Sequence, residues 1–366
     1  MALKIDNTAA TTELISSLSR VKHTPRDTCH IASDIDVVLA GEKCLTYRYV
    51  LITALTAKAV DPRVDMLSLQ IDDPSDGSYA PRSLCKDVVY PFQKKMLDDV
   101  LDGANNDPLV NKPARFLRLS KDNQARGDGR HALFALCDAL PRVKTQDDAR
   151  VCLDYVMTRL LRIAEEKRRR HDEVADAVRS SSATDLRAFL SDLLDQGFGG
   201  DALVLTVSAL YRIQYPESEG YRVIPHPVNQ PGSSKRQSSD LDLEKDGSPF
   251  LGTELKDKPF TADDVKRAAN TAATGGVPGL LFVSGRSGSL NDQTQAYFAT
   301  ARQEFAKKGV YVGLCDVDAL MDIVLSAHHD IDVAEVLGGV YDQVCENAGT
   351  PETQLWIYSR LIALSK

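Results

Sequence analysis

The sequence has no long apolar run, and no segment approaches the roughly 18 unbroken apolar residues that a membrane helix requires. Its first residues, 1–7, are polar and lack the basic stretch followed by an apolar run that marks a secretory signal. We therefore expect a cytoplasmic protein that makes no contact with a membrane.

Paired cysteines and zinc-ligand spacings are also lacking. The seven cysteines are odd in number and scattered, with no Cys-x-x-Cys pair. The seven histidines give no zinc pattern either, because His328 and His329 are adjacent and would lie on different faces of a helix. These absences argue against a disulfide scaffold and a structural zinc, and they predict reduced cysteines that mostly fill the core.

Basic residues are not in excess, since 44 Lys and Arg face 52 Asp and Glu, a formal net charge of -8. The acidity is concentrated in residues 309–366, where nine acids and two bases give -7 and leave only -1 for the rest of the chain. A body near neutrality can still hold a local basic groove, so the net charge does not exclude nucleic acid as a partner.

What is present is the composition of a globular protein, with 43% apolar and 26% charged residues. A length of 366 residues favours two domains. Apolar residues recur at helical spacing in the first half, including one long amphipathic helix from Asp148 to about Val178. We expect a mainly helical region over 1–180, a candidate for DNA recognition, and an α/β (α+β) domain with an acidic helical end over 181–366.

The second half alternates strands and helices around a central sheet flanked by helices. The clearest local signal is Asp246-Gly247, which predicts a hairpin turn. The expected order is helices at 185–195 and 202–213, strands at 221–225, 239–244 and 250–256, a helix at 261–273, a strand at 279–284, a helix at 292–308, a strand at 310–314 and three closing helices.

Charged residues recur at strand spacing on both arms of this hairpin. Because side chains alternate along a strand, Asp240 and Asp242 share one face, and Glu254 and Lys256 share one face. If the arms pair, carboxylates and an ammonium group meet at one end of the sheet. Carboxylate oxygens suit Mg²⁺, and a lysine could orient the attacking water in metal-assisted phosphodiester hydrolysis. Taken alone, the hairpin is equally compatible with a solvated face carrying cross-strand salt bridges.

The wider context favours the catalytic interpretation. The hairpin with Asp242, Glu254 and Lys256, followed by a helix and a buried strand, resembles the core of the PD-(D/E)XK nucleases. A similar run, Ser33-Asp34-Ile35-Asp36, is set aside because no acid-x-Lys strand follows it at hairpin distance, the next lysine being Lys43.

Segments far from the hairpin extend the resemblance. Residues 61–70 (DPRVDMLSLQ), 76–92 (DGSYAPRSLCKDVVYPF) and 111–115 (NKPAR) look like the amino-terminal region of SacI-type restriction endonucleases, and residues 252–261 add to the match. The resemblance implies a type II restriction endonuclease of a restriction-modification system. Such an enzyme would be a homodimer that cleaves double-stranded DNA at a short palindromic site and leaves a 5′-phosphate and a 3′-hydroxyl. A cognate methyltransferase would protect the host DNA.

The resemblance also implies roles for the hairpin residues. Family patterns have one principal acid on the first strand, and the second acid of the triplet is preferred, so Asp242 and Glu254 become the Mg²⁺ ligands together with the carbonyl of Leu255. Lys256 completes the catalytic set, and Asp240 is a possible auxiliary acid that could instead pair with Lys235 or Arg236.

Donor-rich segments elsewhere are candidates for DNA contact, although each residue alone is compatible with an ordinary solvated surface. They are Arg82, Lys86, Asn105, Asn106, Asn111, Lys112, Arg115, Lys258 and Arg286. Two alternatives to a restriction enzyme remain open at this point. One is a methylation-dependent, repair or junction-resolving nuclease of the same superfamily, and the other is a catalytically inactive DNA-binding protein of the same fold.

Overall fold

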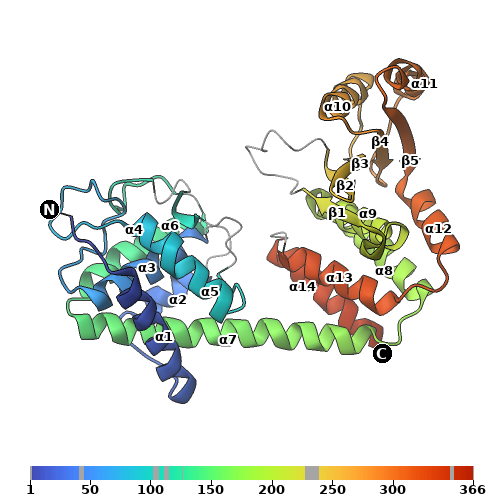
Figure 1. Cartoon of the computed structure of the whole chain (residues 1–366). Helices are drawn as coiled ribbons and strands as arrows, with labels where there is room; N and C mark the ends of the chain where they lie inside the picture. Colours follow the sequence, from blue (N-terminus) through green and yellow to red (C-terminus); the bar gives the residue numbers. More distant parts are fainter. Residues whose placement is uncertain are drawn as a thin grey trace. The chain divides into compact units, whose positions relative to one another are not determined.

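A computed structural model describes residues 2–40, 45–101, 107–110, 115–125, 127–226, 239–346 and 350–365. The chain divides into two compact units, residues 1–169 and 170–366 (Figure 1). The division falls inside the long helix α7, Gln146–Val178, whereas the sequence pattern places the boundary just after that helix, at residue 180.

The first unit is helical and is built around α3 (Thr46–Val60), which is buried along almost its whole length. The helical spacing of the sequence is thereby confirmed for this region. Its other helices pack around one apolar core. They are α1 (Asn7–His23), α2 (Ala32–Ala40), α4 (Pro81–Leu84), η1 (Cys85–Val89), α5 (Tyr90–Met96), η2 (Pro108–Val110), α6 (Asp128–Ala139), η4 (Leu140–Arg142) and the first part of α7.

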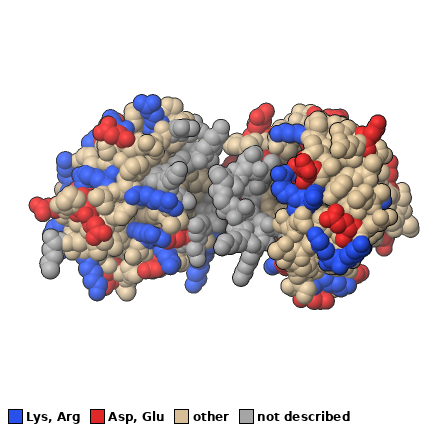
Figure 2. Space-filling model, turned by 90° about the horizontal axis from the view of Figure 1, so that it is seen from above, with Lys and Arg blue, Asp and Glu red and all other residues tan. Residues whose placement is uncertain are grey.

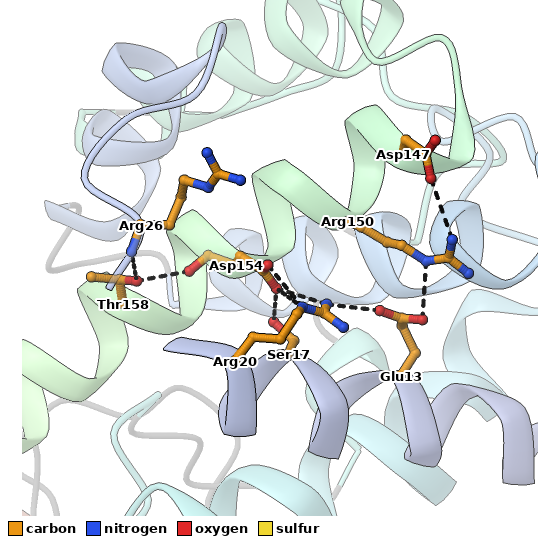
Figure 3. A network of polar contacts seen from close by, with 8 residues as sticks. All are labelled: Glu13, Ser17, Arg20, Arg26, Asp147, Arg150, Asp154 and Thr158. Carbon is orange, nitrogen blue, oxygen red and sulfur yellow. Dashed lines mark hydrogen bonds and ion pairs between the residues drawn. The ribbon is translucent and has the colours of Figure 1, made fainter. Parts of the chain in front are cut away.

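A buried polar network joins α1 to α7 inside this unit (Figure 3). The Asp154 carboxylate of α7 accepts hydrogen bonds from Ser17 Oγ at 2.6 Å and from Arg20 Nε at 2.9 Å, both on α1. Glu13 adds a second contact to Arg20 and one to Arg150. Because a carboxylate only accepts hydrogen bonds, these donors satisfy an acid that is 8% exposed.

Residues 81–96 of the first unit form one helical stretch, because α4 continues through a π-helical turn at 85–89 into α5, and Pro91 lies just after that turn. The Tyr90 amide donates to the Cys85 carbonyl, so Pro91 lies inside a continuous helix, where it has no amide to make the next hydrogen bond. Asp34 and Asp36 lie on α2, a helix, where they bind Arg142 and Arg159.

The second unit is an α+β arrangement, so the expectation of an α/β (α+β) fold with a mixed, helix-flanked sheet is confirmed. Its strands are β1 (Tyr221–Pro225), β2 (Leu241–Lys245), β3 (Ser248–Lys256), β4 (Gly279–Ser284) and β5 (Tyr311–Asp316). Its helices are the end of α7, α8 (Ala183–Gln196), η5 (Phe198–Gly200), α9 (Asp201–Gln214), η6 (Glu217–Glu219), α10 (Ala262–Gly275), α11 (Asp292–Ala306), α12 (Val317–Ala327), α13 (Val333–Glu346), α14 (Pro351–Ile362) and η7 (Ala363–Ser365).

The five strands lie in the order β1-β2-β3-β4-β5. The first three are antiparallel neighbours, and β3, β4 and β5 run parallel. One face, with Leu241 and Val283, packs on α8, α9, α12, α13 and α14. The other face, with Leu280 and Phe282, packs on α10 and α11 (Figure 1).

Two further observations concern the described residues of both units. None of their helices combines the length and the apolar character needed to cross a membrane. Cys29, Cys85, Cys137, Cys152, Cys315 and Cys345 are free thiols, as the scattered spacing predicts.

Candidate active site

The hairpin of β2 and β3 forms as its turn residues predict. Asp246 and Gly247 both have positive φ, at 50° and 77°, which is the conformation of a two-residue turn that matches the twist of the strands. Leu241 pairs with Thr253 and Asp242 with Gly252. Continuing this register by one residue places Asp240 opposite Glu254, and the ladder extends that far because the Asp240 amide donates to the Thr253 carbonyl at 3.1 Å.

This register gathers the charged residues on the sheet face that α10 and α11 cover. Leu241 and Thr253 point to the opposite face, where the Tyr211 hydroxyl lies 2.8 Å from Thr253 Oγ1 in the core. In the parallel pairing of β3 with β4, Glu254 is opposite Phe282. The alternation of side chains predicted from the sequence therefore holds on both arms of the hairpin.

Asp240, Glu254 and Lys256 are close neighbours. The Lys256 ammonium donates to Glu254 Oε2 at 2.5 Å and lies 3.9 Å from Asp240 Oδ2. The same Asp240 oxygen accepts the Leu255 amide at 2.9 Å. Burial, followed by the charge of Asp240, raises the pKa of Glu254, and the attraction of Lys256 only partly offsets that rise.

Asp242 lies on the same face but has different partners. Its Oδ2 is 2.7 Å from His226 Nε2, and its Oδ1 is 2.5 Å from Ser239 Oγ. Sequence reasoning gave no role to His226 or Ser239. The only signal was their place next to the hairpin, a histidine just after a short strand and a serine just before the acid triplet, and neither is distinctive.

A glycine-containing turn holds the end of β3. The Gly285 amide donates to the Lys256 carbonyl at 3.0 Å, and the Ser287 amide donates to Asp257 Oδ1 at 3.1 Å. A Cβ added to Gly288 would lie 2.1 Å from the Lys256 carbonyl oxygen, which is too close for any relaxed backbone. The turn therefore fixes the strand from which the Lys256 side chain extends.

We expect Gly288→Ala to slow the reaction of this site about 10- to 100-fold, because small misplacements of catalytic groups have effects of that size. Gly338→Ala is the matched control, since a Cβ there meets nothing within 4 Å. The rate constant at saturating substrate and the circular dichroism spectrum should be measured for both. Equal rates for the two variants would show that the turn does not position Lys256.

The predicted DNA-contact residues are in varied surroundings. Lys86 and Lys258 are exposed, and Arg115 is exposed with its Nε bound to the Val110 carbonyl. Arg82 is bound to Asp107. Asn105, Asn106, Asn111 and Lys112 lie outside the described residues, as do Lys43, Lys235 and Arg236.

Arg286 is the predicted contact whose surroundings differ most from the expectation. Its guanidinium binds Asp195, Asp318, and both the hydroxyl and carbonyl of Ser191. It would have to leave these partners to meet a phosphate. Figure 2 shows basic and acidic side chains interspersed on the visible face of each unit, so surface charge in that view does not mark one DNA path.

Both units match models of known protein families. The model of the SacI restriction endonuclease N-terminal domain matches residues 9–164, and that of the SacI restriction endonuclease C-terminal domain matches residues 179–286. The type II restriction enzyme SacI of Streptomyces achromogenes is 27% identical over 240 residues, which are 63% of this chain and 62% of the relative's own length. The C-terminal match includes β1 to β4 and with them Asp240, Asp242, Glu254 and Lys256.

Proposed function

The chain belongs to the SacI restriction endonuclease family, and from that premise we propose that it is a type II restriction endonuclease. It hydrolyses phosphodiester bonds of double-stranded DNA at a short palindromic site, with Mg²⁺ as the cofactor. The products carry a 5′-phosphate and a 3′-hydroxyl. The observation that carries the proposal is the meeting of Asp240, Glu254 and Lys256 at one end of the sheet.

Magnesium fits the donors that are present. The described residues contain no group of three His, Cys, Asp or Glu side chains already arranged to hold a metal ion. Mg²⁺ is commonly bound by only one or two carboxylates, together with waters and substrate phosphates. Burial, and after it the charge of Asp240, raises the pKa of Glu254, so the ionised form is costly here and a divalent cation would favour it. Glu254, one of the two acids Asp240 and Asp242, and the Leu255 carbonyl would hold it.

The residues of the chain perform the remaining steps. When bound, magnesium would supply Lewis-acid stabilisation of the charge that develops on the phosphoryl oxygens. Lys256, held by Glu254, directs its ammonium hydrogens toward the attacking water and the phosphate. Water gives up a proton to the solvent as it adds to phosphorus, while the bond to the 3′-oxygen breaks and that oxygen takes a proton from solvent water to leave as the hydroxyl.

The arrangement of the second unit supports membership of the PD-(D/E)XK superfamily. Glu254-Leu255-Lys256 stands as the acid-x-Lys motif at the end of β3, and α10 and the parallel strand β4 follow. Action on a palindrome implies a homodimer, because a two-fold symmetric site is matched by a two-fold symmetric protein. A methyltransferase acting on the same sequence is the partner that such an enzyme needs in its host.

Cleavage of large DNA tests this proposal. Purified protein with Mg²⁺ is expected to cut plasmid and phage DNA into discrete bands, and sequencing the fragment ends should give one recurring palindrome. Removal of Mg²⁺ with a chelator should stop cutting. A smear would indicate a nonspecific nuclease, and cutting of methylated DNA alone would indicate a methylation-dependent enzyme. Binding without cutting would indicate an inactive DNA-binding protein.

A further inference from the structure

Three carboxylates, those of Asp240, Asp242 and Glu254, lie on one face of the hairpin. The surroundings of Asp240 and Asp242 differ. Asp240 and Asp242 are two residues apart on the first arm, so their sequence positions are nearly equivalent. Their exposure is not equivalent, since the side chain of Asp240 is 45% exposed and that of Asp242 is 18% exposed. Glu254 is 16% exposed and lies opposite Asp240.

Both oxygens of Asp242 are bound by side chains that flank it. An ionised carboxylate only accepts hydrogen bonds, so His226 donates to Oδ2 through Nε2 at 2.7 Å. On the other side, the Ser239 hydroxyl lies 2.5 Å from Oδ1. Asp242 is therefore held between the residue that follows β1 and a residue that precedes β2.

Ser239 ties this carboxylate to β3 as well. Its hydroxyl accepts the Thr253 amide at 3.1 Å and lies 2.9 Å from the Leu241 carbonyl. Gly252, which is opposite Asp242, leaves room for the serine, because a Cβ there would come within 3.2 Å of Ser239 Oγ. The contacts thus link Asp242 to all three antiparallel strands.

Asp240 lies where it could share a cation with Glu254. Its side chain is the more exposed of the two acids on the first arm, its Oδ2 accepts the Leu255 amide, and its charge raises the pKa of Glu254. The backbone of His226 also reaches this residue, since its amide donates to the Asp240 carbonyl at 3.0 Å. His226, Asp240 and Glu254 accordingly form one row across β1, β2 and β3.

We propose that Asp240 and Asp242 have different roles, one in binding the cation and one in structure, and that His226 is a positioning residue. Asp240 shares the divalent cation with Glu254, while Asp242, fixed by His226 and Ser239, holds β2 in the register that presents Asp240. This inference rests on the proposed function for its cation and reverses the preference for Asp242 that the sequence pattern suggests. His226 acts through Asp242 and does not touch the DNA phosphate.

Titration of the full chain with Mn²⁺ alone, without DNA, tests the division of roles. Asp240→Asn is expected to weaken Mn²⁺ binding at least tenfold, whereas Asp242→Asn and His226→Ala should weaken it less, because they act only through the placement of Asp240. Glu244→Gln is the control, because Glu244 is on the same strand but pairs with Arg222. An Asp242→Asn loss as large as that of Asp240→Asn overturns the inference, as does unchanged binding by Asp240→Asn.

Cleavage kinetics test the positioning role of His226. His226→Ala should lower kcat about 10- to 100-fold with KM nearly unchanged, as expected for a residue that orients a group at a metal site. His226→Gln, whose amide can still donate, should recover most of that loss. Adding Asp242→Asn to His226→Ala should lower the rate little further, because both changes break one contact. Wild-type kcat in His226→Ala overturns the positioning role.

Failure of this inference can be distinguished from failure of the proposed nuclease function. A wild-type chain that binds Mn²⁺ with the expected variant pattern but cuts no DNA retains the division of the carboxylates and loses the proposed function. A wild-type chain that cuts DNA without binding Mn²⁺ retains nuclease activity and overturns the inference.

Discussion

Glu254→Gln is expected to lower the rate of DNA cleavage by about a thousandfold or more while leaving DNA binding intact. Glutamine keeps the size of the side chain and an oxygen that can accept from Lys256, but it lacks the charge that would hold a divalent cation. Lys256→Met should lower the rate to a similar extent, because it removes the donors that face the attacking water. Single-turnover cleavage and gel-shift binding in Ca²⁺ would measure the two properties separately.

Glu254→Gln is also expected to stabilise the protein at neutral and higher pH. The environment of Glu254, mainly its burial, raises its pKa in the folded state, so the folded chain favours the protonated acid. The stability that this contributes is present below the unfolded pKa and is lost as the pH rises through the folded pKa. Glutamine never ionises. The Tm of Glu254→Gln should therefore exceed that of the wild type at about pH 8 and converge with it below about pH 4.

Glu244→Gln on β2 is the control variant. It loses an exposed pair with Arg222 and should change neither the rate of DNA cleavage nor the Tm appreciably. If Glu254→Gln cut DNA at the wild-type rate, Glu254 would not belong to the catalytic set. If its Tm fell below that of the wild type at pH 8, the ion pair with Lys256 would outweigh the cost of burying the acid.

The elements with a local cause could be predicted from the sequence. Strands β1 and β4 begin and end where the pattern predicts, at 221–225 and 279–284. The capping box of Thr261 with Asp264 begins α10, and Asp246-Gly247 makes the hairpin turn. Each of these features depends on neighbours within a few residues, which a single sequence displays directly.

The partners of the charged residues could not be predicted in this way. His226 meets Asp242 only because β1 pairs with β2, and the contrast between Asp240 and Asp242 depends on the register of three strands. A register shift at Leu243 and Glu244 adds to that difficulty. Arg286 has carboxylate partners 91 and 32 residues away, so its basic charge suggested a phosphate contact that the fold places elsewhere.

Asp154 is the residue of the first unit whose loss we expect to be most damaging. Asp154→Ala should lower the free energy of unfolding of that unit by about 2–4 kcal/mol, because it leaves the fully buried Ser17 hydroxyl without its acceptor and removes the main partner of Arg20. The contact joins α1 and α7, which are more than 130 residues apart in the sequence. Urea denaturation followed by circular dichroism would measure the change.

Two further variants separate charge from geometry in this network (Figure 3). Asp147→Ala removes a carboxylate that is 90% exposed and binds only a neighbour on its own helix, so it should cost less than about 1 kcal/mol. Asp154→Asn keeps an acceptor for Ser17 but not the charge that raises the pKa of Arg20, so its loss should be intermediate. A loss for Asp154→Ala as small as that for Asp147→Ala would mean that apolar packing alone joins α1 to α7. If Asp154→Asn lowered the free energy of unfolding as much as Asp154→Ala does, the ion pair with Arg20 would be what holds α1 to α7. The hydrogen bond to Ser17 would then contribute little by itself.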